Sequence, residues 1–119
     1  MPVCFISGHL DLTGNEFALY YVPVLRDALN QRDRFVVGDA RGADKMAQAW
    51  LAKRNGQVTV FHMFKDPRNN VGSFPTQGGF TTDDERDAAM TAASDRDIAW
   101  VRPGREQSGT AKNLARRAS

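Results

Sequence analysis

Four short apolar runs alternate along the chain with longer stretches in which apolar residues recur every three or four positions. The runs lie at residues 3–7, 35–37, 58–61 and 98–101. Continuous apolar runs of this length are typical of strands that are covered on both faces of a sheet. The pattern therefore predicts four strands, each buried between layers of helices.

The helical stretches open with capping residues. Thr13 and Glu16 have the spacing of a capping box, and Thr82 and Glu85 repeat it. Pro23 lies inside the first stretch and must kink or restart that helix, because proline removes an amide donor. Together these features predict helices at about 13–30, 42–55, 82–93 and 108–117.

Strands that alternate with helices predict an α/β fold. Crossover connections bring the strands into a single doubly wound, mostly parallel sheet with helices on both faces, a Rossmann-like arrangement. Residues 1–119 are expected to form one domain. Residues 63–81, which are rich in Pro, Asn, Gly and Ser, predict an irregular loop with a functional role. Because ligands of such folds bind at the carboxyl ends of the strands, the turns that follow the strands are the candidate ligand contacts.

Composition narrows the class of protein. A hydrophobic content of 41% with 25% charged residues is typical of a globular protein in water. No apolar run approaches transmembrane length, and the first residues lack the features of a signal peptide. The single cysteine, Cys4, fits a reducing compartment. We therefore expect a cytoplasmic protein without membrane association. Cys4, His9 and His62 lack the spacing of metal ligands, so we expect neither a metal nor another cofactor.

The turn Gly38-Asp39-Ala40-Arg41-Gly42-Ala43-Asp44 joins the second strand to the next helix. Its small residues would allow a phosphate to approach the amides at the helix end. Arg41 lies near the positive end of the helix dipole, where a cation is unfavourable unless an anion is bound. In the alternative interpretation, Arg41 pairs with Asp39 or Asp44 and the turn is purely structural. The spacing alone does not separate the two.

Two further turns are expected at the same edge of the sheet. Ser108, Gly109 and Thr110 place a glycine and two hydroxyls at the start of the last helix, either as a phosphate turn or as a plain cap. Ser7, Gly8 and His9 follow the first strand, where His9 would contact a base or a phosphate. Together the turns favour a phosphorylated or ribosylated ligand.

The segment Glu85-Arg86-Asp87 lies in the first turn of the helix after the long loop. Glu85 is the acid of the second capping box, which favours a structural role for it. Arg86 is a second arginine at the start of a helix, where an anion nearby would stabilise it. Arg86, and after it Glu85, are the candidate catalytic residues.

These segments resemble the motifs of a known family. Gly38–Asp44 resembles the GGARGAD segment of the SLOG superfamily, Rossmann-like proteins that include the LOG enzymes and DprA. Residues 85–90 resemble its ERKxxM segment, and Ser108–Thr110 resembles its GGxGT phosphate turn. The resemblance spans nearly the whole chain in the same order. It implies a nucleotide or nucleotide derivative as the ligand, and a homodimer.

The resemblance also bears on catalysis. In the LOG enzymes an arginine, matched here by Arg86, and a glutamate of GGxGTxxE support hydrolysis of the N-glycosidic bond of a nucleoside monophosphate. Asn113 stands at the position of that glutamate, and an amide cannot act as the carboxylate. A carboxylate from elsewhere would have to replace it. The candidates are Asp11, Asp83, Asp84 and Glu85.

Three functions remain open. The first is a module or sensor that binds a nucleotide-type small molecule, and the second is a nucleotide N-glycosidase. The third is a single-stranded nucleic-acid module, suggested by Lys112, Arg116 and Arg117. Single-strand binding calls for aromatic platforms beside the basic groups, and no exposed aromatic series accompanies these residues. Nucleic acid is therefore not the expected partner.

Overall fold

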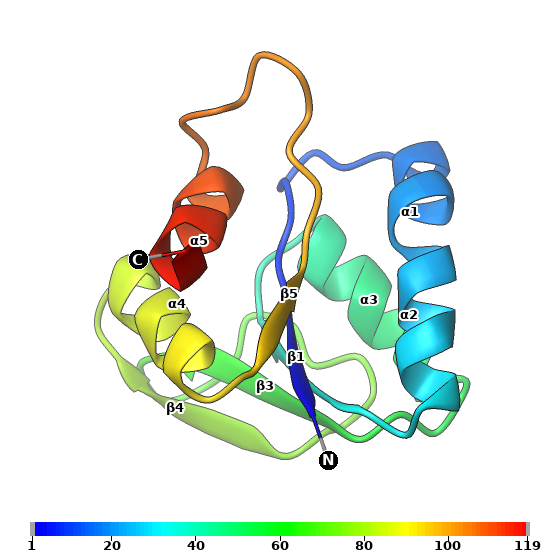
Figure 1. The fold of residues 1–119 in the computed structure, drawn as a ribbon. Helices are drawn as coiled ribbons and strands as arrows, with labels where there is room; N and C mark the ends of the chain where they lie inside the picture. The colour runs from blue at the N-terminus through cyan, green and yellow to red at the C-terminus, as the bar shows by residue number, and fades with distance from the viewer. Residues whose placement is uncertain (1, 119) are drawn as a thin grey trace.

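The computed structural model describes residues 2–118 and contains one five-stranded sheet (Figure 1). Its elements, in chain order, are β1 (Val3–Ile6), α1 (Gly14–Tyr20), α2 (Val22–Asn30), β2 (Arg34–Gly38), α3 (Ala43–Ala52), β3 (Val58–Met63), β4 (Thr76–Phe80), α4 (Asp83–Ala92), β5 (Arg96–Ile98) and α5 (Gly109–Ala118). The strand order is β4-β3-β2-β1-β5, and every neighbouring pair is parallel. The structure confirms the predicted α/β fold with a doubly wound parallel sheet.

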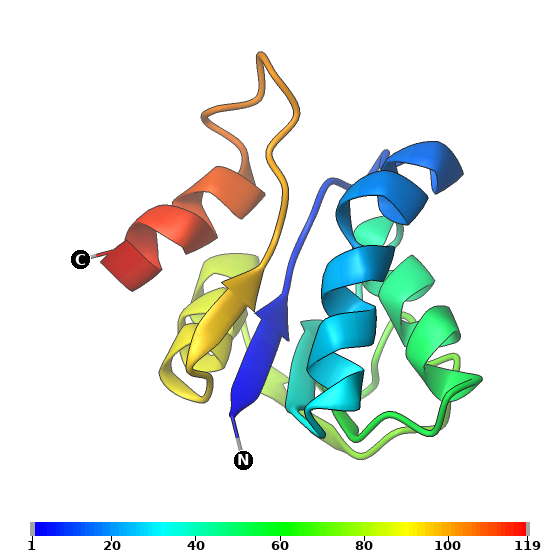
Figure 2. The same cartoon turned by 45° about the vertical axis from the view of Figure 1, so that its right-hand side comes forward.

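Helices cover both faces of the sheet (Figure 2). α1, α2 and α3 lie on one face, and α4 and α5 lie on the other (Figures 1 and 2). Alternate residues of each strand point to opposite layers. In β1, for example, Cys4 and Ile6 belong to the core under α1–α3, whereas Phe5 packs with Met90 of α4.

The strand order reverses beside β1. The chain passes from β1 through β2 and β3 to β4 and then returns to the other side of β1 as β5. The loops that follow β1 and β5 therefore leave the sheet toward opposite layers. In doubly wound sheets, a crevice forms between two such loops at the carboxyl ends of the strands.

The first two helices begin at the capping residues and the proline that the sequence predicts. Thr13 and Glu16 form the predicted capping box, in which the Thr13 hydroxyl accepts from the Glu16 amide at 3.1 Å and the Glu16 carboxylate accepts from the Thr13 amide at 2.9 Å. Pro23 restarts the helix, since α1 ends at Tyr20 and α2 begins at Val22. At the second capping box, the Thr82 hydroxyl accepts from the Glu85 amide, but the Glu85 carboxylate accepts from the Thr81 hydroxyl.

The prediction of an irregular loop over residues 63–81 is wrong in part. Thr76–Phe80 forms β4, which pairs with β3 at the edge of the sheet. Gly78 and Gly79 give this strand low β-propensity, and most of its side chains are exposed, so it has no apolar alternation. Backbone hydrogen bonds to β3 hold it in place. Residues 64–75 form the irregular connection.

The last strand is also displaced from its predicted position at 98–101. β5 spans Arg96–Ile98, because its partner β1 ends at Ile6, which pairs with Ile98. Trp100 lies beyond the sheet, where its ring stacks on Tyr20 with centroids 4.1 Å apart. The apolar character of this segment therefore reflects packing on α1 rather than strand pairing. Among residues 2–118, no helix is long and apolar enough to cross a membrane.

Candidate functional site

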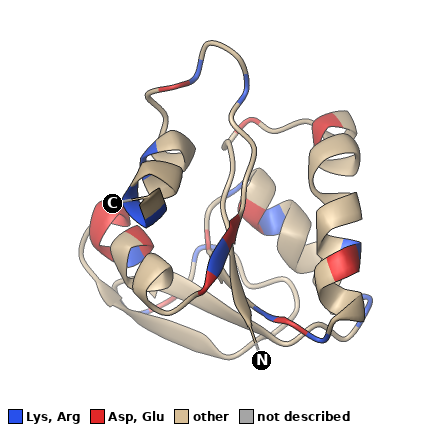
Figure 3. Cartoon of the chain, viewed as in Figure 1, with Lys and Arg blue, Asp and Glu red and all other residues tan. Residues whose placement is uncertain are grey.

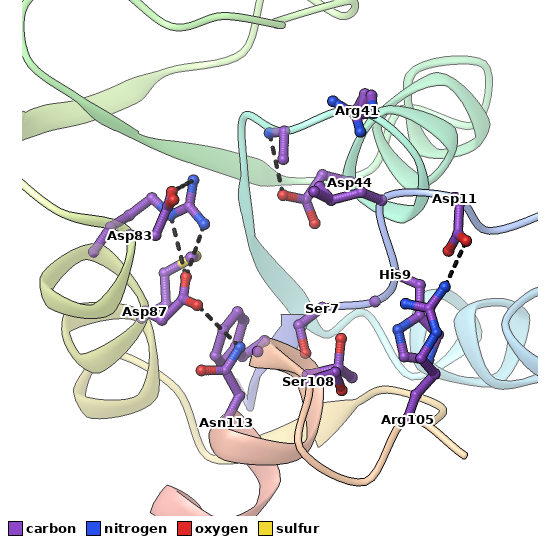
Figure 4. Close-up of a pocket in the computed structure, with 18 of the residues that line it drawn as sticks. Ser7, His9, Asp11, Arg41, Asp44, Asp83, Asp87, Arg105, Ser108 and Asn113 are labelled. Carbon is purple, nitrogen blue, oxygen red and sulfur yellow. Dashed lines mark hydrogen bonds and ion pairs between the residues drawn. The ribbon is translucent and has the colours of Figure 1, made fainter. Parts of the chain in front are cut away.

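A cavity of about 520 Å³ opens at the carboxyl ends of the strands, where the strand order reverses (Figure 4). Its walls are the β1–α1 loop, the β2–α3 turn, the first turns of α4 and the start of α5. Phe5 and Met90 contribute apolar surface to it. Cavities of this size accommodate small organic ligands.

The structure brings many of the sequence-predicted residues to this cavity. Those that line it are Ser7, Gly8, His9, Asp11, Arg41, Asp44, Asp83, Arg86, Ser108, Gly109 and Thr110. The lining does not include Gly38, Asp39, Gly42, Ala43, Asp84 or Glu85. Glu85 lies on a different face of α4 from the buried residues Arg86 and Met90. Its side chain is therefore exposed, and its carboxylate accepts a hydrogen bond from the Thr81 hydroxyl.

The N-terminal end of α3 is already occupied by the side chain of an acidic residue. Oδ2 of Asp44 accepts a hydrogen bond from the Ala40 amide at 3.2 Å. The Ala43 amide donates to the His9 carbonyl at 3.2 Å. The Ala43 amide at the helix end and the Ala40 amide in the turn before it are thus engaged within the chain.

The small residues of this turn serve close packing. Gly42 has a φ of 75°, and a Cβ at this position would lie 2.4 Å from the Leu10 carbonyl oxygen. A Cβ on Gly8 would lie 2.4 Å from the Ala43 Cβ. Glycine is therefore required at both positions for the β1–α1 loop to lie against the start of α3. This reason differs from the predicted one, which was close approach of a ligand.

Arg41 lies exposed at the cavity and makes no hydrogen bond or ion pair with any residue in the described part of the chain. The purely structural interpretation of the turn requires Arg41 to pair with Asp39 or Asp44, and it pairs with neither. Asp39 instead accepts from the Arg68 amide at 2.8 Å and from the guanidinium groups of Arg68 and Arg86, each at 2.9 Å. The arginine of the turn is therefore available to an anion.

Asp39 and Arg86 join β2 to α4. Burial would raise the pKa of Asp39, but the hydrogen bonds from Arg68 and the charges of Arg68 and Arg86 outweigh it and lower that pKa. Arg86 is itself buried and also contacts Asp87 at 3.0 Å and Asp83 at 3.2 Å. With this many partners, the Arg86 guanidinium is fixed against the cavity wall.

The N-terminal end of α5 differs from that of α3. It has no acidic residue in its first turn, and the Ser108 hydroxyl caps it by accepting from the Ala111 amide at 3.2 Å. Ser7 directly follows β1 and Ser108 directly precedes α5, and both line the cavity (Figure 4). The Ser7 hydroxyl oxygen is buried and has no hydrogen-bond partner within residues 2–118. A buried hydroxyl without a partner at a helix N-terminus is suited to an anionic group of a ligand.

His9 is part of the wall rather than a free polar group. Its Nε2 accepts from the Arg102 amide at 2.9 Å, and its ring meets the Trp100 ring edge-on. Burial, followed by the charges of Arg102 and Arg105, lowers the pKa of His9. At neutral pH the ring is uncharged and positions the β5–α5 loop.

Three charged lining residues, Arg68, Asp87 and Arg105, had no role in the sequence prediction. Asn113, considered there only as a replacement for the LOG glutamate, lines the cavity as a hydrogen-bonding group. Asp87 accepts from the Asn113 amide at 3.2 Å and lies one turn beyond Asp83 on the cavity side of α4, a spacing that could have indicated it. Arg68 lies in an irregular connection, where no local pattern indicates which way a side chain points.

Side chains of both charges line the cavity. Acidic residues gather at the start of α4 (Figure 3), and Arg105 lies on the β5–α5 loop. On that loop, Arg105 contacts Asp11 at 2.6 Å. Within residues 2–118, no group of three or more His, Cys, Asp or Glu side chains is placed to hold a metal ion.

No family model, curated protein or solved structure matches the chain. The geometry of the cavity and the motifs of the sequence therefore carry the functional argument.

Proposed function

We propose that the cavity binds a nucleotide or a nucleotide-derived small molecule, as a binding module or sensor, with a phosphate at the N-terminal end of α5. The observation that carries this proposal is the hydroxyl of Ser7. It has no partner in the described chain, and its residue is 94% buried and lines the same cavity as the start of α5. An orphaned buried hydroxyl costs free energy unless a ligand or water satisfies it.

The two helix ends support a single location for the phosphate. At α3 the carboxyl group of Asp44 accepts from the Ala40 amide and so takes the place that a phosphate would need. At α5 the first turn carries no acid, and Gly109 leaves the backbone open, since a Cβ there would meet nothing within 4 Å. Arg41 also lines the cavity and, without a partner in the described chain, supplies positive charge for a second phosphate.

Two further features agree with this function. The resemblance to the SLOG superfamily independently implies a nucleotide ligand. It also leads us to infer a homodimer, which sedimentation of the purified protein tests. The single cysteine leads us to infer a cytoplasmic location. Arg116 and Arg117 contact Asp84 and Asp97 of the same chain, which speaks against their use on nucleic acid.

Thermal shift against AMP, ADP, ATP, ribose 5-phosphate and adenosine tests the proposal. A ligand at about one hundred times its dissociation constant adds about 2.7 kcal/mol, a shift of several degrees. We expect phosphorylated ligands to stabilise the protein and adenosine not to do so. We expect Ser7→Ala to weaken binding about tenfold, because a hydrogen bond to a charged group is lost.

Thr91→Val is the matched control, since the Thr91 hydroxyl is also buried without a partner in the described chain but does not line the cavity. We expect it to bind like the wild type. Equal stabilisation by adenosine and AMP, or no stabilisation by any of the five ligands, would contradict the proposal.

A second candidate is hydrolysis of an N-ribosyl bond. It is favoured by Asp87, which lines the cavity and contacts Asn113, the residue at the position of the LOG glutamate. Water would add to the anomeric carbon of the ribose, and the departing base would take up the proton. We expect release of free base that Asp87→Asn abolishes and that Asp84→Asn, outside the cavity lining, leaves intact. Absence of base release from AMP, GMP, CMP and UMP would remove this candidate.

A further inference from the structure

Asp44 is a buried carboxyl group that faces the cavity. Its residue is 93% buried, and one oxygen, Oδ2, accepts from the Ala40 amide. The other oxygen makes no hydrogen bond, and the carboxyl forms no ion pair, with any residue between positions 2 and 118. Asp39, five residues earlier, has two guanidinium partners, so the lack of one at Asp44 is specific to this position.

This environment is unfavourable for a carboxylate. Burial raises the pKa of Asp44 to about 7, against the opposing charge of Arg86 and the Ala40 hydrogen bond, while Asp87 and Asp39 add to the rise. A buried carboxylate without a cation costs free energy, and one that faces a cavity can be stabilised by a ligand group.

The surroundings select the chemistry of that ligand group. A cationic group would meet the buried guanidinium of Arg86, whose charge acts on Asp44. An anionic group would meet Asp44 itself. A hydroxyl is both a donor and an acceptor, so it pairs with the carboxylate and with the protonated carboxyl alike.

The position of Asp44 fits the sugar of a phosphorylated ligand. Asp44 lines the same cavity and, in the close-up, is set apart from Ser7 and Ser108, where we place the phosphate (Figure 4). The other acids of this region are poorer candidates. Both oxygens of Asp87 already accept hydrogen bonds, and the Asp83 side chain is 62% exposed.

We propose that Asp44 binds a hydroxyl group of the ligand's sugar, so that the site selects a ribosyl phosphate over its deoxy counterpart. This inference rests on the proposed function and adds the sugar to it. Carboxylates bind ribose hydroxyls at the same edge of other doubly wound sheets.

The test compares AMP, GMP, CMP and UMP with their 2′,3′-dideoxy counterparts by isothermal titration calorimetry. We expect at least one ribonucleotide to bind the wild type about tenfold more tightly than its dideoxy form, as one hydrogen bond to a charged group predicts. In Asp44→Ala the two forms should bind within about twofold of each other. Asp44→Val, with a bulkier apolar side chain, provides the same comparison if the alanine variant does not fold.

Asp83→Ala is the control, because Asp83 lines the same cavity but is mainly exposed. We expect it to keep the tenfold preference. Equal binding of ribo and dideoxy forms to the wild type would overturn the role of Asp44 and leave the phosphate site standing. The same preference in wild type and Asp44 variants would also overturn it. Binding of no nucleotide at all would overturn both proposals.

Discussion

Two aspartates of one turn have opposite electrostatic environments. Asp39 and Asp44 are both buried beside β2, and Arg86 acts on both. Arg68 and Arg86 contact Asp39 directly and lower its pKa, whereas burial without such a partner raises the pKa of Asp44. When two carboxyl groups in one site differ in this way, they are suited to different roles.

The raised pKa of Asp44 gives a prediction about stability. The folded pKa of about 7 exceeds the ordinary value of 3.8, so the folded state retains a proton that the unfolded state loses. The contribution of Asp44 to stability therefore falls as the pH rises between these values and stays low above about pH 7. In Asp44→Asn this loss is absent, and the amide oxygen can still accept from Ala40.

Urea unfolding at about pH 5 and about pH 8 measures the effect. We expect Asp44→Asn to gain about 2 kcal/mol in unfolding free energy relative to the wild type over this interval. Asp83→Asn, at an exposed position, should follow the wild type. A difference between Asp44→Asn and wild type that does not change with pH would contradict the assignment of the buried proton to Asp44.

At the scale of elements, the hydrogen bonds of one side chain hold the connection between β3 and β4 in place. Gln48 of α3 is fully buried, and its amide nitrogen donates to the carbonyls of Gly38 and Asn69. Its oxygen accepts from the Val71 amide at 3.0 Å. A single glutamine thus satisfies three backbone groups and holds residues 64–75 beside the end of β2.

Gln48→Leu removes all three hydrogen bonds while keeping a side chain of similar size. We expect it to lower the free energy of unfolding by about 3 kcal/mol, because buried backbone groups lose their partners. We also expect faster tryptic cleavage after Lys65 and Arg68. Gln77→Leu, on the exposed strand β4, should change stability by less than about 0.5 kcal/mol. Unchanged proteolysis in Gln48→Leu would show that other contacts hold the connection.

The elements that the sequence predicts well are those whose side chains face the core. β1, β2 and β3 are apolar because helices cover both faces, and the pattern of burial reads directly from their residues. β4 is held by backbone pairing at an exposed edge of the sheet. Its side chains are mostly exposed, so they show no apolar pattern that would predict a strand. The turns at the carboxyl edge were predicted by topology. The contacts of Arg68 and Asp39 were not, because they depend on how an irregular segment crosses the sheet edge.

At the scale of the whole molecule, the two layers are unequal. The layer of α1, α2 and α3 encloses a cluster of fifteen buried apolar residues in the described chain. The layer of α4 and α5 encloses a cluster of four. Polar contacts supplement the smaller cluster: Arg86 joins α4 to Asp39, and Arg117 of α5 contacts Asp97 of β5. The cavity lies where these two layers meet.

This asymmetry predicts how the molecule opens. Local stability follows buried apolar contact, so the α4 and α5 layer should open at a lower free energy than the layer of α1–α3. In hydrogen exchange followed by mass spectrometry, we expect peptides of α5 to exchange faster than peptides of β1, β2 and α3. Salt at about 1 M should widen the difference, because it screens the partly exposed ion pairs of Arg116 and Arg117.

A nucleotide whose phosphate lies at the start of α5 should slow hydrogen exchange in the α5 peptides. Slowing confined to the α3 peptides would place the phosphate at the other helix end. Equal protection of α5 and the central strands would show that the polar contacts stabilise their layer as strongly as the larger core stabilises the other.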